Sequence, residues 1–193
     1  MAVAAPADTP TILVYGDSLS AAYGIPKEQG WVALMQHRLN KEGYSYHVAN
    51  ASISGETTGG GLVRFSATLD ETRPALVILE LGPNDGLRGL PITDMKRNLA
   101  AMIIAAQKKN AKVLLIGMRI PPNYGPVYTR DFANVYYQLS KEHKLPVVPF
   151  LLDGVAGHRG LIQDDGLHPT AAAQEKLLEN VWKVLEGMLV KPR

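Results

Sequence analysis

The regular alternation of short β-rich runs with longer helical patterns is the feature that most constrains the fold of this chain. Runs of apolar and β-branched residues predict strands at 12–15, 46–49, 76–81, 113–116 and 147–150. Between them, apolar residues recur at helical spacing, in stripes over 31–39, 95–106 and 177–189. Strands that alternate with helices favour a parallel sheet with right-handed crossovers and helices on both faces. The sequence therefore predicts an α/β fold, a three-layer αβα sandwich around a five-stranded parallel sheet.

The length and composition fit one domain that handles small molecules. A chain of 193 residues, 46% of them hydrophobic, can bury an ordinary single core. No repeat or low-complexity linker divides it, so we expect a single domain over 11–193, preceded by a patternless segment over 1–10. The net charge is only +2 and the basic residues are scattered, which disfavours a nucleic-acid surface. No apolar stretch is long enough to span a bilayer, so no stable membrane insertion is expected. The absence of cysteine excludes thiolate metal sites and a cysteine nucleophile.

Polar residues and glycines follow the predicted strands at points where a parallel sheet places its ligands. Ser18 follows the first strand in the run Gly-Asp-Ser-Leu, which indicates a tight turn leading into a helix. Gly55 follows the second strand and Asn84 the third, and the run Asp-Gly-Leu-His over 165–168 lies before the last helical stripe. Because ligands bind beyond the carboxyl ends of parallel strands, these four loops are expected to meet at one edge of the sheet.

Ser18, His168 and Asp165 are the residue types of a serine nucleophile, its base and the carboxylate that orients the base. A serine hydroxyl attacks only when a base takes its proton, and a carboxylate usually orients that base. His168 is the best candidate because Asp165 lies three positions before it, within reach across a turn. Pro169 is expected to begin a helix there. The remaining histidines lie in a helical stripe, a strand, a helix end and a glycine-rich loop, and we interpret them as structural or solvated: His37, His47, His143 and His158.

Three candidate donors could stabilise the oxyanion that forms when Ser18 attacks a carbonyl: the backbone N–H groups of Ser18 and Gly55, and the side-chain amide of Asn84. A turn glycine and a capping asparagine are the structural alternatives for Gly55 and Asn84. The glycine-rich stretch 54–61 lacks the lysine of a Walker loop and the spacing of a dinucleotide-binding motif, so nucleotide binding is not expected. Together these residues predict a serine hydrolase.

These residues resemble the four signature blocks of the SGNH, or GDSL-type, hydrolases. The blocks are Gly-Asp-Ser-Leu over 16–19, Gly55, Gly-Pro-Asn-Asp over 82–85 and Asp-Gly-Leu-His over 165–168, in the family's order. Within the family the chain is most similar to the bacterial thioesterase I, lysophospholipase L1 and arylesterase branch, through the runs 50–55, 84–89 and 122–125. One residue departs from that branch, which usually has two glycines before Asn-Asp, because Pro83 stands at the second. Proline has no N–H and a fixed φ, so we expect Pro83 to stiffen the loop leading to Asn84.

The resemblance implies a flavodoxin-like sheet and an esterase of broad specificity that works through an acyl-enzyme. It implies Ser18, Asp165 and His168 as the catalytic triad, Ser18, Gly55 and Asn84 as the oxyanion hole, and no metal or organic cofactor. An acyl-CoA thioesterase or lysophospholipase is the close alternative, and a catalytically silent ligand-binding domain is the alternative from another class. Small-molecule esters or thioesters are the expected partners of a monomer. The small-residue-rich start and the branch together predict a periplasmic or secreted protein, with a cytoplasmic one as the alternative.

Overall fold

The computed structural model describes residues 9–191. The expected terminal segment over 1–10 therefore lies almost wholly outside the described residues. Within them, no helix is long and apolar enough to cross a membrane.

Five strands form one parallel sheet in the order β2-β1-β3-β4-β5. Their bounds are β1 Thr11–Gly16, β2 His47–Asn50, β3 Leu76–Glu80, β4 Lys112–Ile116 and β5 Val147–Val148. The three central strands are almost entirely buried because helices cover both faces. From β1 the chain pairs outward with β2 and then returns to pair β3 on the other side, so the switch point lies between β1 and β3. The flavodoxin-like order places the ligand site at the carboxyl ends of these two strands.

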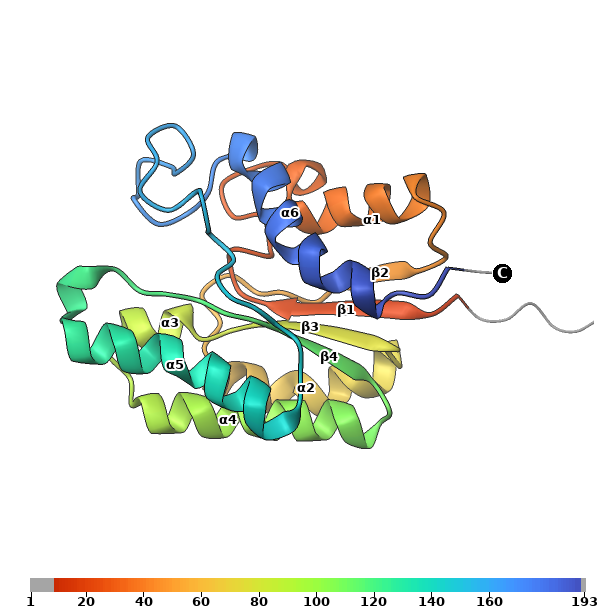
Figure 1. Ribbon diagram of the computed structural model, residues 1–193, viewed down its shortest axis with the longest axis horizontal. Helices are drawn as coiled ribbons and strands as arrows, with labels where there is room; N and C mark the ends of the chain where they lie inside the picture. Colours follow the sequence, from red (N-terminus) through yellow and green to blue (C-terminus); the bar gives the residue numbers. More distant parts are fainter. Residues whose placement is uncertain (1–8, 192–193) are drawn as a thin grey trace, which may run out of the picture.

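The helices form the two outer layers of the predicted sandwich. Their bounds are α1 Trp31–Lys41, α2 Thr58–Thr72, α3 Pro83–Leu87, α4 Ile92–Lys108, α5 Pro126–His143 and α6 Gln174–Leu185. Short 3₁₀ turns lie at Lys27–Gln29, Pro122–Tyr124, Ala171–Ala173 and Glu186–Met188. Figure 1 shows α1 and α6 on one face of the sheet and α2, α4 and α5 on the other. The short helix α3 and the long loop before α6 lie at the same end of the molecule, where β1 and β3 end (Figure 1).

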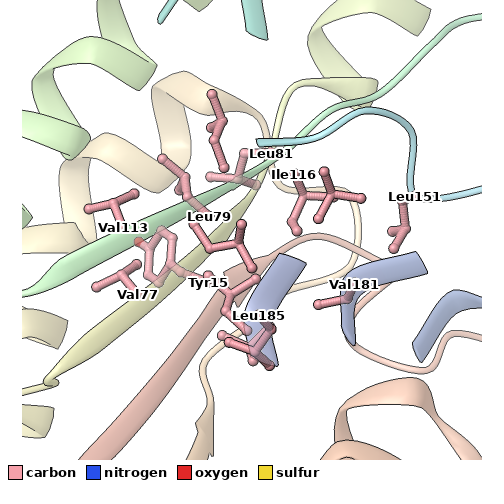
Figure 2. Close-up of a cluster of buried hydrophobic side chains, with 14 of the residues drawn as sticks. Tyr15, Val77, Leu79, Leu81, Val113, Ile116, Leu151, Val181 and Leu185 are labelled. Carbon is pink, nitrogen blue, oxygen red and sulfur yellow. The ribbon is translucent and has the colours of Figure 1, made fainter. Parts of the chain in front are cut away.

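The core fills the space between the sheet and both helical layers. Side chains of β1, β3 and β4, such as Tyr15, Leu79 and Val113, lie in one buried cluster, and Val181 and Leu185 join it from α6 (Figure 2). The tryptophans and methionines of the helical stripes are buried in the core, except Met188, which is partly buried and packs against it. Burial of each large apolar side chain contributes about 1.5–3 kcal/mol relative to its exposure. The sheet is therefore a rigid platform for the loops at its carboxyl edge.

Two local expectations were wrong. The chain after Ser18 forms a series of turns through Gly24 rather than a helix, and the left-handed Ala22, with φ 59°, prevents a helix from continuing past it. Pro169 does not begin a helix: it pairs with Ile162 in an isolated bridge, and α6 begins only at Gln174 after a 3₁₀ turn. The bridge holds the backbone beside His168 to a neighbouring loop instead. His168 is thus positioned by loop contacts and not by a helix.

Candidate active site

Ser18, His168 and Asp165 form a continuous hydrogen-bonded chain. The His168 Nε2 atom lies 2.9 Å from the Ser18 Oγ atom, and the His168 Nδ1 atom lies 2.5 Å from Asp165 Oδ2. Ser18 lies in the turn directly after β1, and Asp165 and His168 lie in the loop before α6. His168 is 150 positions away from Ser18 in the sequence. The fold therefore brings together the three residues that the sequence singled out.

Asp165 is held ionised by the loop that carries it. Its Oδ1 atom accepts the backbone N–H groups of Leu167, at 2.9 Å, and His168, at 3.0 Å. These two hydrogen bonds and the bond from the His168 ring lower the pKa of Asp165 to about 2. Because the carboxylate accepts a hydrogen from Nδ1, the Nε2 lone pair faces the Ser18 hydroxyl. This is the tautomer that a base for Ser18 needs.

Tyr23 and Gln163 hold His168 from the side of the nucleophile turn. The Tyr23 ring lies against the His168 ring, with the ring centroids 4.4 Å apart. Gln163 Nε2 donates to the carbonyl oxygens of Tyr23 and Pro169, both at 2.9 Å, and the Gln163 N–H donates to the His168 carbonyl oxygen at 2.7 Å. Sequence reasoning missed both residues. Gln163 joins two loops far apart in sequence, so no local pattern could have identified it.

Two backbone N–H groups near Ser18 are free to meet a ligand. Within residues 9–191, the N–H groups of Ser18 and Gly55 have no protein acceptor. Gly55 sits at the third position of a turn closed by the hydrogen bond from the Glu56 N–H to the Ile53 carbonyl oxygen. Its φ of 79° is one that glycine adopts without strain. Arg88 Nη2 donates to the Gly55 carbonyl oxygen at 2.9 Å and fixes this peptide from the other side.

The Asn84 amide joins the loops that follow β1, β2 and β3. Its Nδ2 atom donates to Asp17 Oδ2 at 3.1 Å and to the Glu56 carbonyl oxygen at 3.0 Å. Asn84 lies in α3, whose next residue, Asp85, is buried and accepts both the N–H and the hydroxyl of Thr58, at 2.8 and 2.6 Å. These bonds fix α3 against the start of α2. The amide is therefore oriented before any ligand arrives.

Pro83 begins α3 and lines the cavity described below. Gly82 before it has φ 125° and ψ −30°, outside the extended region that the residue before a proline prefers. A side chain at Gly82 would also meet the Tyr136 hydroxyl, since a Cβ there would lie 2.3 Å from it. The stiffening expected of Pro83 stays a prediction; Gly82 before it adopts a conformation that residues with a side chain reach only with strain.

A cavity of about 510 Å³ opens beside Ser18, Asn84 and His168. Its walls are mostly apolar, with Leu87, Ile120, Phe150 and Leu152 among the lining residues. Arg119 also lines it; its guanidinium lies 4.9 Å from the centre of the Phe150 ring and makes no ion pair with any residue that the structure describes. A mostly apolar cavity with a few polar groups fits a small ligand with an acyl or aryl part. Residues 9–191 contain no group of three or more His, Cys, Asp or Glu that could hold a metal ion.

Comparison with known proteins identifies the family of this chain and several relatives. The sequence model of the GDSL-like lipase/acylhydrolase family matches residues 14–176. The esterase TesA of Pseudomonas aeruginosa is 54% identical over 179 residues, which cover 93% of this chain and 89% of that protein. The Escherichia coli protein named thioesterase 1/protease 1/lysophospholipase L1 is 38% identical over 186 residues, which cover 96% of this chain and 87% of that one. The crystal structure of the psychrotrophic esterase EstA from Pseudoalteromonas sp., inhibited by monoethylphosphonate, is 42% identical, with a TM-score of 0.88 over 92% of this chain and 97% of that one.

Proposed function

Since the chain belongs to the GDSL-like lipase/acylhydrolase family, we propose that it hydrolyses carboxylic and aryl esters through an acyl-enzyme on Ser18. Two of its relatives, TesA and EstA, are named as esterases. The single observation that carries this proposal is the hydrogen-bonded chain from Ser18 to His168 to Asp165, whose first two members line a mostly apolar cavity. A silent binding domain would have no use for a serine hydroxyl aimed at an oriented base.

In the first half of the reaction, Ser18 Oγ attacks the ester carbonyl carbon while its proton passes to His168 Nε2. The ionised Asp165 stabilises the imidazolium that results and keeps the ring in position. When the tetrahedral intermediate collapses, the bond to the leaving oxygen breaks and the proton on Nε2 passes to that oxygen. The alcohol or phenol departs, and the acyl group stays on Ser18.

In the second half, water repeats the attack that Ser18 made. His168 Nε2 takes a proton from the water as its oxygen bonds to the acyl carbon. Collapse of the second intermediate breaks the bond to Ser18 Oγ, which recovers the proton from Nε2. The carboxylic acid leaves, and the site returns to its starting state without a cofactor being consumed.

The negative charge that grows on the carbonyl oxygen is stabilised by Ser18 N–H, Gly55 N–H and the Asn84 amide. The two backbone donors support this role because neither has a protein acceptor in the described part of the chain. Both hydrogens of Asn84 are already bonded, to Asp17 and to the Glu56 carbonyl oxygen, so the oxyanion shares or displaces one of these acceptors. The Ser18 and Gly55 N–H groups are fixed by the backbone before the reaction, so they need no reorganisation as the charge develops.

One observation favours thioesters or lysophospholipids as further substrates. Arg119 lines the cavity and has no carboxylate partner among the described residues, so its guanidinium is available to a phosphate on the leaving group. Coenzyme A and lysophospholipids both carry such phosphates, whereas simple aryl esters do not. A series of nitrophenyl esters of increasing chain length, assayed beside acyl-CoAs and a lysophospholipid, ranks these classes.

We also propose a monomer that acts in the periplasm. The first part is supported by a site assembled from loops of one chain, and the second by the branch of the family that the sequence resembles. Size-exclusion chromatography tests the first part, and fractionation of cells that express the natural gene tests the second.

Replacement of the nucleophile tests the mechanism directly. Ser18→Ala should lose about four to six powers of ten in kcat on a short nitrophenyl ester, because the acyl-enzyme can no longer form. A phosphonate ester should add one phosphonyl group to the wild-type chain, located on Ser18 by peptide mass spectrometry, and none to the variant. Ser66→Ala, at an exposed position of α2, is the matched control and should behave as wild type. Ser18→Ala protein that keeps a tenth of the wild-type kcat, with contamination excluded, would contradict the proposal.

A further inference from the structure

Two carboxyl groups lie completely buried beneath the candidate oxyanion hole, and the reaction described above uses neither. Asp17, at the end of β1, and Glu80, at the end of β3, are both 0% exposed. The two residues are in contact, since the Asp17 N–H donates to Glu80 Oε2 at 3.3 Å. Two ionised carboxylates buried this close together would repel each other, whereas a proton on one of them removes the repulsion. The arrangement therefore favours a proton on one of the two groups.

The contacts of the two carboxyl groups indicate which of them carries that proton. Both Asp17 oxygens accept a hydrogen bond, Oδ1 from the Leu19 N–H at 3.0 Å and Oδ2 from the Asn84 amide at 3.1 Å. Glu80 accepts only on Oε2, from the Ser20 hydroxyl at 2.7 Å and the Asp17 N–H at 3.3 Å. Its Oε1 atom is buried and receives no hydrogen bond. Both oxygens of Asp17 thus receive hydrogen bonds, as an ionised carboxylate requires, whereas Glu80 Oε1 receives none and can carry the proton.

Within residues 9–191, no lysine, arginine or histidine forms an ion pair with either carboxyl group. The titratable groups that face the pair are Asp85 from α3 and Tyr136 from α5, neither of which supplies positive charge at neutral pH. Burial raises the pKa of Asp17 to about 7, and burial together with the charge of Asp17 raises the pKa of Glu80 well above its usual value. Gly16 shows how closely the group is packed, because a Cβ there would lie 2.6 Å from Glu80 Oε2.

We propose that Glu80 is a positioning residue that stays protonated and donates to Asp17, so that Asp17 fixes the Asn84 amide and the turn that carries Ser18. The inference rests on the proposed function, since it assigns a support to the same oxyanion site. In the sequence, Asp17 directly precedes Ser18 and directly follows Gly16, against which Glu80 packs. A second negative charge in the pair would repel the first and shift both Asn84 and the nucleophile turn. Glu80, in an otherwise apolar strand, thus acts on the reaction through Asp17 and Asn84, without touching substrate.

Infrared difference spectroscopy tests the protonation state independently of activity. Wild-type protein at neutral pH should show the carbonyl stretch of a buried un-ionised carboxylic acid, and Glu80→Gln should lack it. Glu142→Gln, at an exposed carboxylate paired with Lys96 on the surface, is the control and should keep the band. Absence of the band in wild type, or its persistence in Glu80→Gln, would overturn the proposal. Because this measurement uses no substrate, its failure would leave the proposed esterase function untouched.

Kinetics then separate positioning from simple structural support. A glutamine can donate to Asp17 and accept from Ser20 as a protonated glutamate does, so Glu80→Gln should keep more than about a tenth of the wild-type kcat. Glu80→Leu, which is similar in size but has no donor, should lose about a hundredfold in kcat with little change in KM. As the pH is raised, the infrared band and kcat of wild type should change over the same range. Loss of the band with kcat unchanged, or an inactive Glu80→Gln that folds normally, would refute the positioning role.

Discussion

Removal of the Asn84 amide should slow the chemical step far more than it weakens substrate binding. Asn84→Ala deletes one of three proposed oxyanion donors, and loss of one such donor costs about 10² to 10³ in kcat, or about 2.7–4 kcal/mol in the barrier. The KM should change little because the charge that the amide meets appears only after Ser18 has attacked. Initial rates on a short nitrophenyl ester over a range of concentrations give both constants.

The same change should also lower stability, by an amount that the contacts define. Asn84 donates to the buried Asp17 carboxyl and to the Glu56 carbonyl oxygen, so its loss leaves Asp17 Oδ2 without that donor. An unsatisfied buried acceptor costs about 1–3 kcal/mol. Urea unfolding followed by circular dichroism should therefore show a lower midpoint with an unchanged slope.

A control in the same region separates these two effects. Asn98→Ala removes an amide that donates to the Thr58 hydroxyl at 3.2 Å. That hydroxyl bonds to Asp85, the residue after Asn84, so Asn98 itself does not reach the oxyanion site. It should lower the free energy of unfolding by about 0.5–1.5 kcal/mol and leave kcat within about threefold of wild type. The reasoning fails if Asn84→Ala raises KM and keeps kcat, or if Asn98→Ala lowers kcat to the same degree.

Three further results are expected. Asp165 should stay ionised above about pH 4, because the hydrogen bonds from its own loop lower its pKa to about 2. Asp165→Asn should therefore cut kcat on a short ester by about 10³ to 10⁴ with the fold intact, and a variant that keeps a tenth of the wild-type kcat would speak against Asp165 as the partner of His168. Pro83→Gly should change KM across a chain-length series, since Pro83 lines the cavity, while the short-ester kcat stays within about tenfold; a collapse of that kcat would mean that Pro83 positions the oxyanion donor. Arg119→Gln should raise KM for an acyl-CoA by about tenfold and leave KM for a nitrophenyl ester unchanged, and equal effects on both would remove the argument for a phosphate contact.

Sequence periodicity was sufficient to predict the sheet and its layers. A strand such as β3 is continuously apolar because both of its faces are covered, and helices such as α4 show their buried stripe at a spacing of three to four residues. The same reasoning located Ser18, Asn84 and the loop of His168 at one edge, because the carboxyl ends of parallel strands must meet there. The hydrogen bonds from Ser18 to His168 to Asp165 are consistent with that prediction.

The sequence alone determined the alternation of elements, the residues with the chemistry of a nucleophile and a base, and the family resemblance. The tertiary structure decided what depends on contacts between distant loops: the turn in place of a helix after Ser18, the Gln163 bonds that hold the His168 loop, and the free N–H of Gly55. Glu80 illustrates the difference most clearly. Its position in an apolar run was visible in the sequence, but its meaning was not, because a buried carboxyl can be understood only from the partners that the fold places around it. Local patterns record which face of an element is buried, whereas a buried polar group depends on residues brought together by packing.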